Sequence, residues 1–200
     1  FLLICLFESI GVSDQISILI SLSLGLLLTG ALHEDGVADF FDSLGGKDYT
    51  TRQKILKDSR LGTYGVLALM IVFLLKFLLI SGLESRLALV CGLIASSSLG
   101  RFSILLLVNY SDLSKQAGLT KYLKKVNKRT IILCGIFCML WIIPAGLPAI
   151  VITIIFGYAF LYFFKKFIIP FNRGLSGDII GLCVVFVEIF SLLVITASFY

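Results

Sequence analysis

Six apolar stretches alternate with polar segments along this chain. A helix needs about 20 mainly apolar residues to cross a bilayer. Three stretches reach that length, and the other three require tilting or flanking residues. The pattern therefore predicts an all-α, polytopic integral membrane bundle of about six transmembrane helices, built as a single domain over residues 1–200. The stretches are Ile16–Ala31, Thr63–Ser81, Leu87–Val108, Ile131–Pro144, Leu147–Phe164 and Ile179–Phe199.

Composition supports a membrane protein. Hydrophobic residues make up 58% of the chain and charged residues 14%, whereas soluble domains are about half apolar and a quarter charged. The apolar opening Phe1–Phe7 has no basic lead or cleavage site of a signal peptide, so we interpret it as the end of a helix and expect an N-terminal truncation. The five cysteines lie in apolar runs without a C-x-x-C pattern, so no zinc site is predicted.

The positive charges predict an orientation. If the stretches cross alternately, loops 32–62, 109–130 and 165–178 share one side and carry 14 of the 17 Lys and Arg residues. Basic loops lie in the cytoplasm, so we expect a multi-pass protein of the cell inner membrane whose active site faces the cytoplasm. The expected surroundings are the lipid bilayer and no nucleic acid, and a homo-oligomer is left open.

The most informative polar segment is acidic. Asp35, Asp39 and Asp42 follow the spacing i, i+4, i+7 and fall on one face of a helix that Gly45–Gly46 would end. Like charges at this spacing destabilise a helix, and clustered carboxylates suit Mg²⁺. We predict a cytoplasmic amphipathic helix that binds Mg²⁺; a solvated acidic face is the alternative.

A basic segment completes the predicted catalytic loop, residues 32–62. Arg52, Lys54, Lys57 and Arg60 surround Asp58. Cations beside a carboxylate-bound metal suit a diphosphate, because both neutralise charge during phosphoryl-group transfer. Contact with lipid headgroups is the alternative.

Four charged residues fall inside or at the start of apolar stretches, where charge is costly and usually functional. Arg101 lies about 10 Å from the cytoplasmic end of its stretch at 1.5 Å per residue, and Glu188 lies near mid-membrane. The two could also pair with each other. Asp178 could serve the helix N-terminus, and Lys76 could extend to the outer surface.

Together these residues resemble the signature of the cobalamin synthase family. The resemblance continues through Lys76, Arg101, Gly118–Leu119, Gly177–Gly181 and Glu188, and so covers most of the chain. The two parts of the signature are Thr29-Gly30-x-Leu32-His33-x-Asp35-Gly36-x-Ala38-Asp39-x-x-Asp42 and Lys57-Asp58-Ser59-Arg60-Leu61-Gly62-Thr63-x-Gly65.

The resemblance implies an inner-membrane transferase of the last stage of cobalamin synthesis. Such an enzyme uses Mg²⁺ to join adenosylcobinamide-GDP to α-ribazole or its 5′-phosphate and releases GMP. It implies metal binding by Asp35, Asp39 and Asp42. It further implies catalytic roles for Asp58 (as metal ligand or base), Arg60 and Arg101 (on phosphates), and substrate binding by Lys57, Asp178 and Glu188.

Two departures from the family pattern are visible. The basic, proline-containing lead and its apolar helix are absent, in line with the expected truncation. Relatives often carry a second acid where this chain has Val185, which leaves a carboxylate pair in the last helix in doubt.

Two other functions remain as alternatives. A CDP-alcohol phosphotransferase would carry an Arg after the Asp35-Gly36-Val37-Ala38 run, where this chain has Asp39, and its later aspartates would be spaced differently. A cation-binding transporter or scaffold would place its charges near the membrane midplane, whereas most charges here flank the apolar stretches.

Overall fold

The computed structural model describes residues 1–56, 58, 60–111, 122–171 and 173–199. Regular secondary structure in this part of the chain is helical, without a β-strand. Its elements are α1 (Leu2–Ser9), α2 (Asp14–Thr29), α3 (Leu32–Ser43), α4 (Tyr49–Ile55), α5 (Thr63–Ser81), α6 (Arg86–Tyr110), α7 (Lys128–Leu140), η2 (Ile143–Ala145), α8 (Gly146–Phe163), η3 (Phe164–Ile168), α9 (Ile169–Phe171) and α10 (Gly177–Phe199).

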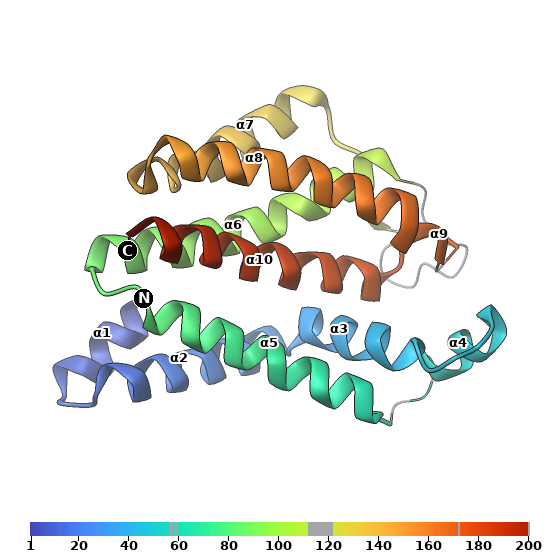
Figure 1. The fold of residues 1–200 in the computed structure, drawn as a ribbon, viewed down its shortest axis with the longest axis horizontal. Helices are drawn as coiled ribbons and strands as arrows, with labels where there is room; N and C mark the ends of the chain where they lie inside the picture. Colours follow the sequence, from blue (N-terminus) through green and yellow to red (C-terminus); the bar gives the residue numbers. More distant parts are fainter. Residues whose placement is uncertain (57, 59, 112–121, 172, 200) are drawn as a thin grey trace.

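The last helix is the centre of the bundle. α10 packs against α3, α5, α6 and α8 (Figure 1). Of its most apolar 18-residue window, 67% is buried, compared with 22% for α5 and 44% for α6. Because α10 is shielded on several sides, the outer helices leave their own apolar faces to lipid.

Four helical stretches in the described residues are long and apolar enough to cross a membrane: α5, α6, the continuous stretch Ile143–Phe171, and α10. The all-α multi-pass membrane bundle is therefore confirmed. The described residues contain four candidate spans, or five if α2 and α3 form one broken span bent by 86°, compared with the expected number of about six. The difference arises because Ile131–Pro144 yields only α7, of 13 residues, and Ile16–Ala31 ends at the bend.

The bend before α3 uses two consecutive left-handed residues. Gly30 has φ 65° and Ala31 has φ 50°, and the Ala31 N–H donates to the Leu26 carbonyl at 2.9 Å, which closes the end of α2. Residues other than glycine rarely adopt this left-handed conformation. The contacts of α3 with α5 and α10 must therefore hold the bend in place.

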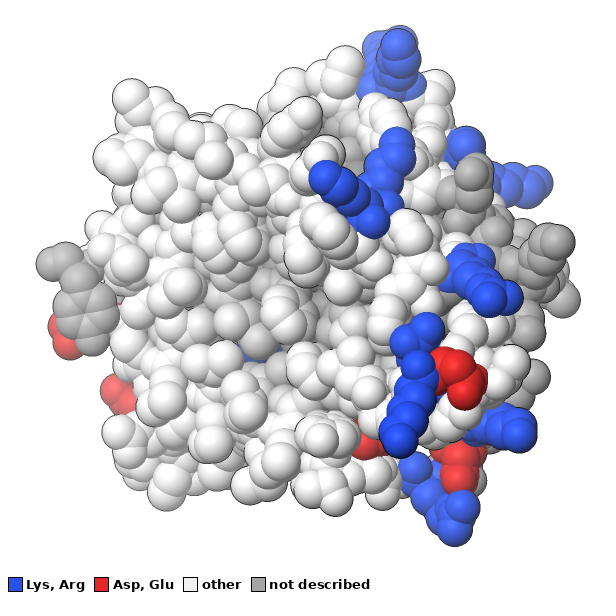
Figure 2. Space-filling model, turned by 45° about the vertical axis from the view of Figure 1, so that its right-hand side comes forward, with Lys and Arg blue, Asp and Glu red and all other residues white. Residues whose placement is uncertain are grey.

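Lys and Arg side chains gather at one end of the molecule. Figure 2 shows Lys and Arg concentrated at one end, while the middle of the same face is almost entirely uncharged. This separation agrees with the predicted grouping of the basic loops on one side of a membrane. We call the end that carries the described parts of the basic loops 32–62, 109–130 and 165–178 the basic end.

A layer of charge divides the apolar interior. One apolar cluster contains Ile80 and Leu192, and the other contains Val72 and Val185. Lys76 falls between these pairs on α5, and Glu188 falls between them on α10. The interior therefore consists of two apolar clusters separated by charged side chains.

Candidate functional site

Two glycines let the acidic helix α3 touch the central helix α10. A Cβ on Gly36 would lie 2.8 Å from the backbone oxygen of Asp178, and a Cβ on Gly181 would lie 2.8 Å from that of His33. Neither position can carry a larger side chain without moving the helices apart. The close crossing places Asp178, at the start of α10, beside the carboxylates of α3.

The predicted acidic helix forms, and it carries a row of carboxylates. Asp35 is exposed and Asp39 is half-buried. The Asp39 carboxylate lies within the electrostatic range of Asp35, Asp178 and Asp42. Within the part of the chain that the structure describes, the side chains of Asp35 and Asp39 have no hydrogen bond or ion pair. This negative charge is available to a cation.

Asp42 has a different environment. Its two carboxylate oxygens accept hydrogen bonds from the backbone N–H groups of Gly62, at 2.7 Å, and Gly65, at 2.8 Å. These groups belong to the N-terminus of α5, whose first N–H groups lack partners within the helix. Asp42 thus caps α5 from a neighbouring helix, and a Cβ on either glycine would collide with its carboxylate.

Whether a metal ion fits this site depends on whether the protein alone or the protein together with its substrate supplies the ligands. Among the described residues, no three His, Cys, Asp or Glu side chains are grouped so that they could hold an ion. Mg²⁺ in phosphoryl-transfer sites is usually held by one or two carboxylates together with substrate phosphates and water. Asp35 and Asp39 fit that arrangement, in which the substrate completes the coordination. To bind a metal as predicted, Asp42 would have to use carboxylate oxygens that already accept hydrogen bonds from backbone N–H groups.

Asp58 and Arg60 pair with each other at the basic end. Arg60 Nε donates to Asp58 Oδ1 at 3.0 Å, and Nη2 donates to Oδ2 at 2.7 Å. These hydrogen bonds lower the pKa of Asp58. The Arg60 side chain is 87% exposed, so it can still reach an anion. Lys57, predicted to bind substrate, lies outside the described residues.

Another member of the basic segment is used for packing. The guanidinium of Arg52, on α4, lies 3.9 Å from the centre of the Phe171 ring. This cation–π contact ties α4 to α9, so a direct contact of Arg52 with phosphate is disfavoured.

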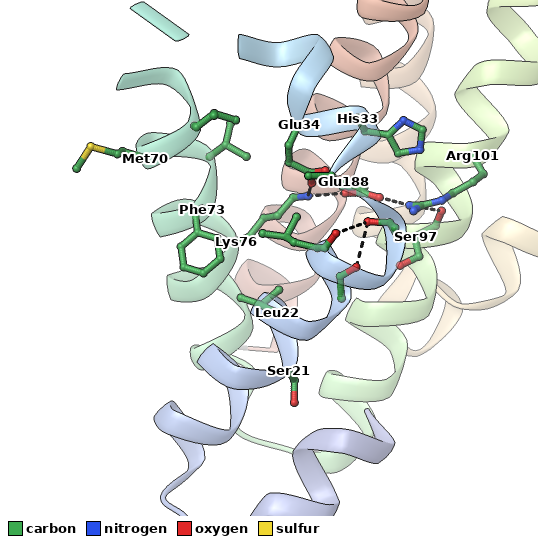
Figure 3. Close-up of a pocket in the computed structure, with 16 residues that line it drawn as sticks. Ser21, Leu22, His33, Glu34, Met70, Phe73, Lys76, Ser97, Arg101 and Glu188 are labelled. Atoms are coloured by element: carbon green, nitrogen blue, oxygen red, sulfur yellow. Dashed lines mark hydrogen bonds and ion pairs between the residues drawn. The ribbon is translucent and has the colours of Figure 1, made fainter. Parts of the chain in front are cut away.

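The charged layer contains Glu34, Lys76, Arg101 and Glu188 (Figure 3). Lys76 Nζ donates to Glu34 Oε1 at 2.9 Å and to Glu188 Oε2 at 2.7 Å, while Arg101 donates to Glu188 Oε1. The pairing of Arg101 with Glu188 agrees with the alternative derived from the sequence. The interpretation of Lys76 as reaching the outer surface is wrong, because its side chain is only 12% exposed and points inward.

Glu34 is a site residue that sequence reasoning missed. It lies in the signature, but its spacing distinguishes it from the carboxylate row, and its partner Lys76 is 42 residues away. The available signal was Lys76 within an apolar stretch, since a buried charge usually has a partner of opposite charge.

A cavity of about 620 Å³ adjoins this layer. Its walls are formed mainly by apolar residues of α2 and α5, and its floor by His33 and the charged layer (Figure 3). The structure therefore brings Arg101 and Glu188 together at the cavity and Asp35, Asp39 and Asp178 together on α3 and α10, with the Asp58–Arg60 pair in the loop before α5.

Comparison with known proteins places the chain in a family. A family model for Cobalamin-5-phosphate synthase matches residues 1–196. An adenosylcobinamide-GDP ribazoletransferase of Shewanella frigidimarina is 36% identical over 196 residues, which cover 92% of this chain and 72% of the relative. No solved structure matches the chain.

Two further relatives have the same name. That of Vibrio cholerae is 33% identical over 192 residues, covering 92% of this chain and 72% of the relative. That of Shewanella woodyi is 34% identical over 178 residues, covering 84% and 67%. The resemblance seen in the sequence is thereby confirmed: this chain belongs to the cobalamin-5-phosphate synthase family and is a transferase of cobalamin biosynthesis.

Proposed function

We propose that this chain joins adenosylcobinamide-GDP to α-ribazole or its 5′-phosphate, with Mg²⁺, at the cytoplasmic face of the inner membrane. The names of its relatives support the two substrates. The observation that carries the chemistry is the row of Asp35 and Asp39, which lack described partners and lie beside Asp178. The positive-inside rule supports the cytoplasmic location of the basic end.

In the proposed reaction, a ribose hydroxyl of the nucleoside attacks the phosphorus that bears the cobinamide. A new P–O bond to the ribose forms, the bond to the bridging diphosphate oxygen breaks, and GMP leaves. The hydroxyl proton passes to solvent or to the leaving phosphate. When bound between Asp35, Asp39 and the diphosphate, Mg²⁺ would neutralise negative charge on the phosphate oxygens.

The chain's own residues bind and orient the diphosphate. Arg60 is exposed and can donate to phosphate oxygens, and Asp58 fixes the orientation of its guanidinium through two hydrogen bonds. Because its pKa is lowered, Asp58 is a weak proton acceptor. We therefore assign it the positioning of Arg60 rather than the role of general base. Asp178 lies close enough to interact electrostatically with Asp35 and Asp39 and adds negative charge beside the row.

The experiment that tests this function is an assay of GMP release by the purified protein. Both substrates are supplied, singly and together, with Mg²⁺ or with a chelator. We expect GMP only when both substrates and Mg²⁺ are present. Asp35→Asn and Asp39→Asn should each reduce the rate at least about 100-fold, as is typical when transition-state charge loses its stabilisation.

The matched control is Asp14→Asn. Like Asp35, Asp14 is exposed and lies in the first turn of a helix, α2, but it is outside the acidic row. It should keep the wild-type rate, and all three variants should elute as folded protein from size exclusion. Full activity of the Asp35 and Asp39 variants would contradict the metal site, and GMP release without the nucleoside would contradict the transfer.

A further inference from the structure

We infer that the cavity between α2 and α5 is the binding site of the nucleoside substrate, a ribose that carries an apolar bicyclic aromatic base. This inference rests on the proposed function and adds to it the position of one of the two substrates. The corrinoid substrate with its diphosphate then binds at the basic end, outside the cavity.

The walls of the cavity suit an apolar aromatic ring. Leu22 and Leu26 of α2 line it together with Leu69, Met70 and Phe73 of α5. Pockets for small molecules usually measure roughly 300–1,000 Å³ and combine apolar walls with a few polar groups. At about 620 Å³ the cavity has room for a nucleoside, whereas a corrin ring with its side chains and nucleotide is far larger.

The floor of the cavity offers hydrogen bonds to a ribose. Every hydrogen bond described for Arg101 uses Nη1, which donates to Glu188 and to the Ser97 carbonyl. A guanidinium has five N–H donors, and 47% of the Arg101 side chain is exposed. Its remaining donors, together with the half-buried His33, can meet ribose hydroxyls.

The charge of the floor favours the nucleoside over the diphosphate. Lys76 and Arg101 contribute two positive charges, and Glu34 and Glu188 contribute two negative charges, so the four side chains balance. A diphosphate requires an excess of cations. Such an excess is found at the basic end (Figure 2) but not on this floor.

The cavity and the carboxylate row are neighbours along helix α3. Glu34 lies on the floor, and the next residue, Asp35, begins the row on the same helix. Asp39 follows one turn later, a rise of about 6 Å at 1.5 Å per residue. A ribose on the floor is therefore within a few ångströms of the helix that carries the proposed metal ligands. Figure 2 also shows a small Lys or Arg surface set back within the uncharged face.

Gly25 provides a direct test. It lines the cavity from α2, and a Cβ at this position would meet no atom within 4 Å. Gly25→Leu therefore places side-chain atoms in the cavity and reduces its volume, with no clash at Cβ and no backbone strain. Gly157→Leu is the matched control, because Gly157 is also helical, also has open space around its Cβ, and lines a separate apolar groove beside α8.

The measurement is the KM of each substrate, with direct binding of α-ribazole to the purified protein by calorimetry as a second readout. Gly25→Leu should raise the KM and Kd for the nucleoside about tenfold or more, the scale on which hydrophobic pockets discriminate shape. The KM for adenosylcobinamide-GDP should change less than about twofold in the same variant. Gly157→Leu should change none of these constants.

An unchanged nucleoside KM and Kd in Gly25→Leu would overturn the inference. It would also be overturned if the wild type retained a bound phospholipid that this variant lost while both KM values stayed unchanged, because the cavity would then be a lipid site. Equal increases of both KM values would also overturn it. Failure of the proposed function looks different, since the wild type itself would then release no GMP when given both substrates.

Discussion

Removal of the Lys76 amine should destabilise the bundle strongly. Lys76 Nζ lies 2.9 Å from Glu34 and 2.7 Å from Glu188, and these three side chains are 12–15% exposed. Lys76→Met keeps the length of the side chain and removes the charge. Two carboxylates then face each other in a poorly hydrated interior.

The expected loss follows from that geometry. Two unit charges 4 Å apart interact by about 4 kcal/mol at an effective dielectric constant of 20, and removing one partner of a buried ion pair costs about 3–5 kcal/mol. For a chain of this size, each kcal/mol shifts Tm by about 2–4 °C. We therefore expect a Tm roughly 10 °C below that of the wild type, measured by thermal unfolding in a single detergent.

A second variant separates charge from packing. In Lys76→Met/Glu34→Gln, Glu188 keeps Arg101 as its partner and no unpaired carboxylate remains. At least half of the lost Tm should return. Lys166→Met is the control, because Lys166 is exposed and surface substitutions usually change stability by less than about 0.5 kcal/mol. Equal stability of the single and double variants would refute the role assigned to the charged layer.

Two further changes test the packing of α3. Asp42→Ala removes the acceptor for the Gly62 and Gly65 N–H groups. It should lower the free energy of unfolding by about 1–2 kcal/mol, measured by denaturant titration. An Asp42→Asn variant as unstable as Asp42→Ala would argue against capping. Gly36→Ala places a Cβ against the Asp178 backbone. It should lower the free energy of unfolding by about 1–3 kcal/mol and reduce the rate of GMP release. Gly157→Ala, whose Cβ meets open space, should change neither stability nor rate.

The long apolar elements were the part of the fold that sequence could predict. The stretch Thr63–Ser81 has the same bounds as α5, and the acidic helix begins and ends close to the expected residues. Both depend on local properties: continuous hydrophobicity in one case, and the spacing of carboxylates with a terminal glycine pair in the other.

Relations between distant segments were not predictable in the same way. The bend at Gly30–Ala31 needs an alanine in a left-handed conformation, which local preference opposes and packing against α5 and α10 imposes. Lys76 finds partners 42 and 112 residues away, and Asp42 finds its partners 20 and 23 residues away. No periodicity within one segment encodes such pairs.

The placement of these pairs explains why only part of the acidic helix is left for chemistry. α3 has 12 residues, too few to cross a bilayer or to bury much apolar surface alone. Near its first turn Glu34 binds the Lys76 side chain, and near its last turn Asp42 binds the amides at the start of α5. Two carboxylates thus fix both ends of α3 to the same neighbouring helix, while Gly36 fixes its middle against α10. Because α3 is held at three points, the backbone positions of Asp35 and Asp39 stay one helical turn apart on the same face. A bound cation would relieve the repulsion between their carboxylates, as the proposed site for a metal-bound diphosphate requires.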